Sequence, residues 1–133
     1  MSLTEEEKNL MVQHRLNRAN DTLAEAKDLL NLNHCHGATN RLYYACYYAV
    51  TALLMKHGHV GRTHGGVIGL FGKYFVMTDI VSKEQNKLYT KLFDLRLGSD
   101  YSDWIYINEE DIKPLIEPAE KFITEIENLI NNT

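Results

Sequence analysis

The feature that most constrains the fold is an aromatic-rich segment, Asn40 to Ala49, which reads NRLYYACYYA and contains four tyrosines. Leu42, Cys46 and Leu53 recur at helical spacing, and the tyrosines cover much of the remaining surface. A helix that is apolar nearly all round packs against neighbours on several sides. The segment therefore predicts a helix from about residue 38 to residue 55 or 57, at the centre of a helical bundle.

Four other segments carry a stripe of apolar residues at helical spacing on an otherwise polar surface. Thr4–Glu7 and Ser82–Gln85 have the pattern of a capping box, and Thr63 is placed to cap a short helix. The sequence predicts helices that begin near residues 4, 64, 82 and 108. We predict an all-α fold: an antiparallel up-and-down bundle of four long helices plus one short helix, as a single domain over residues 1–133.

Glycine and proline mark the points where these helices are expected to deviate. The four glycines of the short helix, between positions 65 and 72, reduce helix propensity, so we expect them to permit close approach of another backbone. Gly98 and Ser99 are expected to end or fray the fourth helix. Pro118 is expected either to kink the last helix or to form its first turn.

The net charge of −4 argues against broad binding to duplex DNA, which requires an extended basic face. A local basic pocket for one nucleotide or a strand end is compatible with this charge. The longest apolar stretch, residues 42–55, is shorter than the roughly 20 residues that a membrane span requires. The acidic start of the chain lacks the pattern of a signal peptide. We expect a cytoplasmic protein that binds neither duplex DNA nor a membrane.

The six histidines raise the question of a metal site. His34 and His36 precede the central helix, whereas His57, His59 and His64 follow it. The helix separates the two groups by roughly 30 Å at 1.5 Å per residue, so they do not meet within one protomer. Neither group has the paired spacing of a structural zinc site. We expect solvated turn histidines, and neither a metal nor another cofactor.

Arg96, Asp100 and Tyr101 form the main candidate site. Arg96 lies four residues after Leu92 and seven after Tyr89, so it projects beside the packed stripe of its helix. A buried arginine requires a partner, and Asp100 is the local one if the helix persists through Gly98. The pair is then either a structural clamp at the end of the helix or part of a phosphate site, which the planar guanidinium suits.

A second candidate is Thr63-His64-Gly65-Gly66, at the start of the short helix. Backbone N–H groups at a helix start bind anions, and glycines let a ligand approach. In an up-and-down bundle, the starts of the first and third helices and the end of the fourth share one pole, which places His64 near Arg96. Most tyrosines of the central helix are expected in the core, with one or two hydroxyl groups, such as that of Tyr44, turned toward a polar groove.

Three blocks together resemble the HEPN family, nucleotide-binding domains of higher eukaryotes and prokaryotes. The blocks are NRLYYACYYA at 40–49 with ALL at 52–54, THGGV at 63–67, and Arg96-x-x-x-Asp100-Tyr101. The resemblance covers residues 8 to 131. It implies an antiparallel helical bundle, usually a homodimer, and many prokaryotic members act with a minimal nucleotidyltransferase as a toxin–antitoxin pair.

Several members of the family are metal-independent ribonucleases that use an arginine followed, after four to six intervening residues, by histidine. Arg96 matches that arginine and is the candidate catalytic residue. The histidine positions hold Tyr101, Ser102 and Asp103, so the expected general acid/base is absent. The sequence instead has the Asp-Tyr ending of a distinct branch.

Three functions follow from these residues. The first is a HEPN-type homodimer that binds a nucleotide, an RNA end or a nucleotidyltransferase partner through Arg96, Asp100 and Tyr101. The second is an RNA-cleaving toxin that uses Arg96 with Tyr101 or His64, and the third is a structural dimerisation module. The apolar segment 104–107 is expected either to form a dimer or partner surface or to fold back over the end of the bundle.

Overall fold

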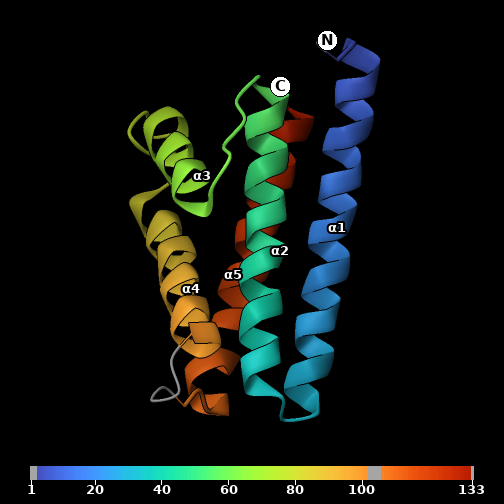
Figure 1. The fold of residues 1–133 in the computed structure, drawn as a ribbon. Helices are drawn as coiled ribbons and strands as arrows, with labels where there is room; N and C mark the ends of the chain where they lie inside the picture. The colour runs from blue at the N-terminus through green and yellow to red at the C-terminus, as the bar shows by residue number, and fades with distance from the viewer. Residues whose placement is uncertain (1–2, 102–105, 133) are drawn as a thin grey trace.

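The computed structural model describes residues 3–101 and 106–132, with Tyr101 described by its backbone only. Every regular element in these ranges is helical, which confirms the predicted all-α fold class. Over the described residues, the chain forms four long helices and one short helix. Figure 1 shows the long helices side by side, with the short helix above the start of α4. The elements are α1 (Glu5–Asn31), α2 (Cys35–Lys56), α3 (His64–Phe71), the π-helical turn η1 (Gly72–Val76), α4 (Lys83–Tyr101) and α5 (Glu109–Asn131).

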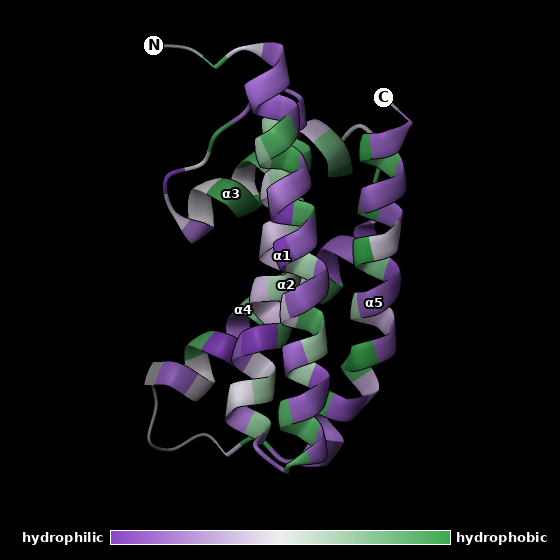
Figure 2. Ribbon diagram, turned by 90° about the vertical axis from the view of Figure 1, so that its right-hand side faces the viewer, coloured by the Kyte–Doolittle hydropathy of each residue, from purple (hydrophilic) through white to green (hydrophobic). Residues whose placement is uncertain are grey.

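Helix α2 is the centre of the bundle, as the aromatic segment predicted. It packs against α1, α4 and α5, and it also meets α3. The predicted stripe of Leu42, Cys46 and Leu53 is completely buried. Figure 2 shows the complementary pattern on the outside, where much of the surface of α1 and α5 is hydrophilic. None of the helices in the described ranges is long and apolar enough to span a bilayer.

The helix starts follow the predicted capping signals. Thr4 and Glu7 form a reciprocal capping box, with both hydrogen bonds 3.1 Å long. The Thr63 hydroxyl accepts a 2.9 Å bond from the Gly66 N–H. At the start of α4, the Ser82 hydroxyl accepts from the N–H of Gln85, but the Gln85 side chain bonds to Glu125 on α5. Ser82 therefore caps the helix, while Gln85 links two helices.

One helix end differs from the prediction made at glycine, and one of the two alternatives at Pro118 is excluded. Helix α4 does not end at Gly98; it continues to Tyr101, because one glycine costs only about 1 kcal/mol and Arg96 pairs with Asp100 across that turn. Helix α5 begins at Glu109 and runs through Pro118, so this proline does not form its first turn. The buried apolar stripe of α5 outweighs the hydrogen bond that the proline removes.

The glycines of α3 do not have the role that we predicted. A methyl group built on Gly65, Gly69 or Gly72 would meet no atom within 4 Å, so these positions do not serve close backbone approach. Close approach occurs instead at Gly61, before the helix, where a methyl carbon would lie 2.7 Å from Val67 Cγ2.

The end of α4 lies at the opposite pole from the start of α1. Its last residues bond to the start of α2: Asn40 Nδ2 donates to Asp100 Oδ2 over 3.1 Å. The prediction that the end of α4 shares a pole with the starts of α1 and α3 was therefore wrong. His64 nevertheless lies beside α4, with its ring centre 6.0 Å from that of Phe93. Figure 1 shows that the segment after α2 runs back along the bundle before α3 begins.

Candidate functional site

The candidate site is centred on the buried guanidinium of Arg96, in the second half of α4. Arg96 is 7% exposed. Its Nε donates to Asp100 Oδ2 over 3.1 Å, as the spacing of four residues predicted. The guanidinium carbon lies 5.6 Å from the ring centre of Tyr43 and 5.3 Å from that of Tyr44. Arg96 is thus held between a carboxylate and two aromatic rings.

A second arginine reaches the same site from α2. Arg41 donates from Nε (3.1 Å) and Nη2 (2.8 Å) to Oδ1 of Asn40, whose amide nitrogen donates to Asp100. The Arg41 guanidinium lies 5.2 Å from the ring centre of Tyr44. Glu25 of α1 is 3.9 Å from Arg41. Two guanidinium groups therefore share one tyrosine ring, and an amide and a carboxylate join them.

His64 brings a third titratable group to the site. Its Nδ1 lies 2.7 Å from the Tyr43 hydroxyl, which leaves Nε2 for a ligand. The imidazole lies 5.6 Å from the ring of Tyr43, 5.7 Å from that of Tyr44 and 4.9 Å from that of Tyr47. Burial, and then the positive charge of Arg96, lower the pKa of His64. The ring is accordingly neutral near pH 7, and in the tautomer whose Nδ1–H donates to the Tyr43 hydroxyl its Nε2 is an acceptor and a weak base.

Tyr43 links the site to the core. It is completely buried, and its ring stacks on that of Tyr89, with centres 5.9 Å apart and planes 4° from parallel. Burial raises the pKa of Tyr43 well above its ordinary value, so the hydroxyl remains protonated beside His64. Tyr43 is therefore a rigid support for His64 and Arg96 rather than an anionic group.

The structure brings together four of the six predicted site residues. Arg96, Asp100, His64 and Tyr44 lie in one cluster, whereas the Thr63 hydroxyl is occupied as the cap of α3. The side chain of Tyr101 lies outside the described residues.

Three residues of α2 were missed: His36, Asn40 and Arg41. We predicted His36 as a solvated turn residue, but its Nδ1 is hydrogen-bonded to the Ser99 hydroxyl of α4. His36, Asn40 and Tyr44 recur at intervals of four, a stripe that faces the Arg96–Asp100 turn. This spacing of four is the signal that could have identified His36 and Asn40.

Of the apolar segment 104–107 that follows α4, the structure describes only residues 106 and 107. Ile107 is 6% exposed and belongs to the core, while Tyr106 is 81% exposed. Trp104 and Ile105 lie outside the described residues. Folding back over the bundle is thus observed for Ile107 and not for Tyr106.

In the part of the chain that the structure describes, no three His, Cys, Asp or Glu side chains lie close enough to hold a metal ion. The groups that the site presents are guanidinium, imidazole and phenol. Guanidinium groups bind phosphate through their donor fork, and the tyrosine faces accept a planar ring. This combination suits an anion attached to a base.

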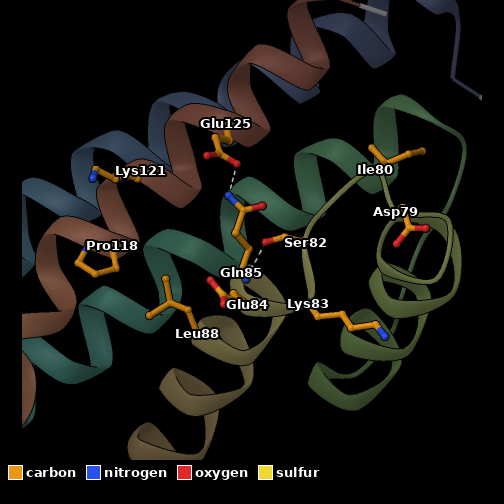
Figure 3. A pocket seen from close by; sticks show the side chains of 10 residues that line it. All are labelled: Asp79, Ile80, Ser82, Lys83, Glu84, Gln85, Leu88, Pro118, Lys121 and Glu125. Atoms are coloured by element: carbon orange, nitrogen blue, oxygen red, sulfur yellow. Dashed lines mark hydrogen bonds between the residues drawn. The ribbon is translucent and has the colours of Figure 1, made fainter.

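A hollow of about 920 Å³ lies elsewhere, between the start of α4 and the middle of α5 (Figure 3). Lys83 and Lys121 line it together with three carboxylates, those of Asp79, Glu84 and Glu125. This hollow therefore has no excess of positive charge for an anion.

Fold and site together define a small all-α bundle with a buried arginine set among aromatic rings. The fold resembles the crystal structure of TT1696 from Thermus thermophilus, with a TM-score of 0.74 over 88% of this chain and 96% of that one. Their sequences are 17% identical, so this similarity concerns the fold alone.

The sequence comparisons identify the family. The HEPN domain profile matches residues 12–129. The chain is 39% identical to a protein named "UPF0332 protein" from Thermotoga maritima, over 95% of this chain and 96% of the relative. It is 30% identical to a protein named "Putative toxin MJ0605" from Methanocaldococcus jannaschii, over 90% of this chain and 88% of the relative. The chain belongs to the HEPN domain family.

Proposed function

We propose that this protein is a toxin-like HEPN protein that binds a nucleotide or an RNA end at the cluster of Arg96, Arg41, His64 and Tyr44. The observation that carries the proposal is that Arg96, Arg41 and His64 all lie against the ring of Tyr44. Such an arrangement offers two guanidinium groups for a phosphate beside aromatic faces for a base. The names of the relatives, which include two putative toxins, support a toxin-like role.

Binding is tested by isothermal titration of the purified protein with UMP and with a short single-stranded RNA. Arg96→Ala should remove measurable UMP binding, because it removes the buried guanidinium and leaves Asp100 facing the ligand. Arg96→Lys should restore little, since an ammonium lacks the planar fork. Lys113→Ala is the matched control: it removes an exposed positive charge on α5 that is paired with Glu109. Unchanged UMP affinity in Arg96→Ala would show that the cluster around Arg96 does not bind UMP.

RNA cleavage is the second candidate, favoured by the position of His64. The family's motif histidine is absent after Arg96, but His64 lies against the same two rings, Tyr43 and Tyr44, as the arginine. The neutral imidazole is suited to take the proton of the 2′-hydroxyl as its oxygen bonds to phosphorus and the P–O5′ bond breaks. Arg96 would stabilise the negative charge on the phosphoryl oxygens, and the departing 5′-oxygen would take a proton from the imidazolium or from water.

Expression of the chain alone separates binding from cleavage. Cleavage predicts growth arrest and RNA fragments, both removed by His64→Gln and by Arg96→Ala. Healthy growth and intact RNA with the wild-type chain at verified expression would exclude the enzyme.

The homodimer and the nucleotidyltransferase partner are further parts of the proposal, which rest on the family. Sedimentation velocity should give twice the mass of 15.3 kDa. Co-expression with a nucleotidyltransferase encoded next to this chain should give a complex that survives purification. A monomer at all concentrations would refute the homodimer, and a nucleotidyltransferase that purifies without this chain would refute the partner. Neither result bears on the UMP test.

A further inference from the structure

A second group of positive charges lies on α1, beside Tyr48 of α2 and outside the Arg96 site. It surrounds a hollow of about 260 Å³ that is lined by Met11, His14, Arg15, Arg18 and Tyr48. None of these residues carries a carboxylate, although the whole chain has a net charge of −4. The hollow is therefore locally positive, although the protein as a whole is negatively charged.

The two arginines of this hollow are held in place but not neutralised. Arg18 Nη2 donates to the Tyr48 hydroxyl over 2.9 Å, and its guanidinium carbon lies 4.9 Å from the Tyr48 ring centre. Arg15 Nη1 donates to Thr51 Oγ1 over 3.0 Å. Among the described residues neither arginine forms an ion pair, in contrast to Arg41 and Arg96. Each keeps further N–H donors for an anion.

The acidic groups that act on Arg18 lie away from the hollow. They are Asp21 and Glu25, about one and two turns further along α1. Glu25 lies 3.9 Å from Arg41 and so faces that arginine as well. The basic residues Arg15, Arg18 and His14 therefore line the hollow together with Met11 and Tyr48, without a carboxylate among them.

The hollow is connected to the Arg96 site by aromatic rings. The ring of Tyr48 lies 6.1 Å from that of Tyr44, which in turn lies 5.3 Å from the Arg96 guanidinium. Two rings of α2, Tyr44 and Tyr48, thus lie between Arg96 of α4 and Arg18 of α1. Aromatic planes beside positive charges are how proteins bind single-stranded nucleic acid without reading its sequence.

We propose that the hollow around Arg15, Arg18 and Tyr48 is a second subsite, which binds a phosphate and the adjoining base of a single strand whose end lies at Arg96. The guanidinium forks bind the phosphate, and the Tyr48 ring supports the base. A duplex is excluded because its stacked bases offer no free face to the tyrosine. This inference rests on the proposed function, since the proposed function places the end of the strand at Arg96.

The test measures the binding of a fluorescein-labelled RNA strand of roughly eight nucleotides by fluorescence anisotropy, beside UMP binding by calorimetry. The double variant Arg15→Ala/Arg18→Ala should bind the strand roughly tenfold or more weakly but bind UMP as the wild type does. The slope of log Kd against log salt should fall by about 0.7 for each lost phosphate contact. Arg96→Ala should weaken both ligands.

Controls separate charge and stacking from general damage to the fold. Lys121→Ala removes an exposed positive charge on α5 and should leave strand binding unchanged. Tyr48→Phe should retain strand binding because it keeps the ring, whereas Tyr48→Leu should lose roughly tenfold. Circular dichroism confirms that each variant is folded.

Three results overturn the subsite. They are wild-type strand affinity in the double arginine variant, tighter binding of duplex RNA than of the single strand, and equal competition by a polyglutamate peptide. Equal binding of a DNA strand supports it, because rings and phosphates are common to both nucleic acids. If UMP does not bind the wild type, the proposed binding site at Arg96 is refuted. Strand binding that depends on Arg15 and Arg18 would still support the proposed subsite in the hollow.

Discussion

At the scale of the residue, Arg96 combines a structural and a binding role. Its side chain is almost completely covered, and Asp100, Tyr43 and Tyr44 surround it. We expect Arg96→Ala to lower the free energy of unfolding by about 1–3 kcal/mol, because it removes the ion-pair partner of Asp100 and leaves a space between the rings. Urea denaturation followed by circular dichroism measures this loss. A change below about 0.5 kcal/mol would mean that the site does not stabilise the fold.

The histidines predict how stability depends on pH. Burial first, and then neighbouring positive charge, lower the pKa of both His64 and His57 below the ordinary value of 6.5. Below pH 6.5 the unfolded chain therefore binds more protons than the folded chain, and the folded state loses stability as the pH falls. His64→Gln and His57→Gln should each flatten this decline. Urea denaturation at a series of pH values checks it, and identical pH slopes in wild type and both variants would contradict it.

At the scale of the element, glycine acts differently inside and before α3. Gly69 lies in the helix with open space around it, so Gly69→Ala should raise the free energy of unfolding by about 0.5–1 kcal/mol. Gly61→Ala is the matched comparison, because its methyl carbon would lie 2.9 Å from the backbone nitrogen of buried Val67. It should lower stability by about 1–3 kcal/mol. Equal effects of the two variants in urea denaturation would contradict this account.

The helices could be predicted because their signals are local. Periodic apolar residues and the caps at Thr4, Thr63 and Ser82 depend on neighbours within a few positions. The site could be predicted only in part, because His36 and Asn40 acquire their roles from the end of α4, about sixty residues away along the chain. The continuation of α4 through Gly98 was likewise missed, since it depends on the Arg96–Asp100 pair as well as on propensity.

At the scale of the whole molecule, a column of aromatic rings joins the core to the site. Phe122 of α5 packs on Tyr89 of α4, with ring centres 5.9 Å apart, and Tyr89 stacks at the same distance on Tyr43 of α2. Tyr43 then contacts His64 and Arg96. Three helices that are distant in sequence thus fix the position of the two groups to which we assign binding. The rigidity of the site is a property of the bundle rather than of α4 alone.

This column predicts that the described helices unfold as one unit. Phe122 is 1% exposed and meets Phe71 as well as Tyr89, so Phe122→Ala should lower the free energy of unfolding by about 3–5 kcal/mol. Leu10→Ala, at a position that is 66% exposed on α1, should change it by less than about 0.5 kcal/mol.

Far-ultraviolet circular dichroism, which follows the helices, and near-ultraviolet circular dichroism, which follows the aromatic rings, should give coincident urea transitions. In Phe122→Ala the two transitions should move together, because loss of one ring weakens the packing of α2, α4 and α5 at once. Separate transitions would show that the rings and the helices belong to different cooperative units, and the single domain over residues 1–133 would then be wrong.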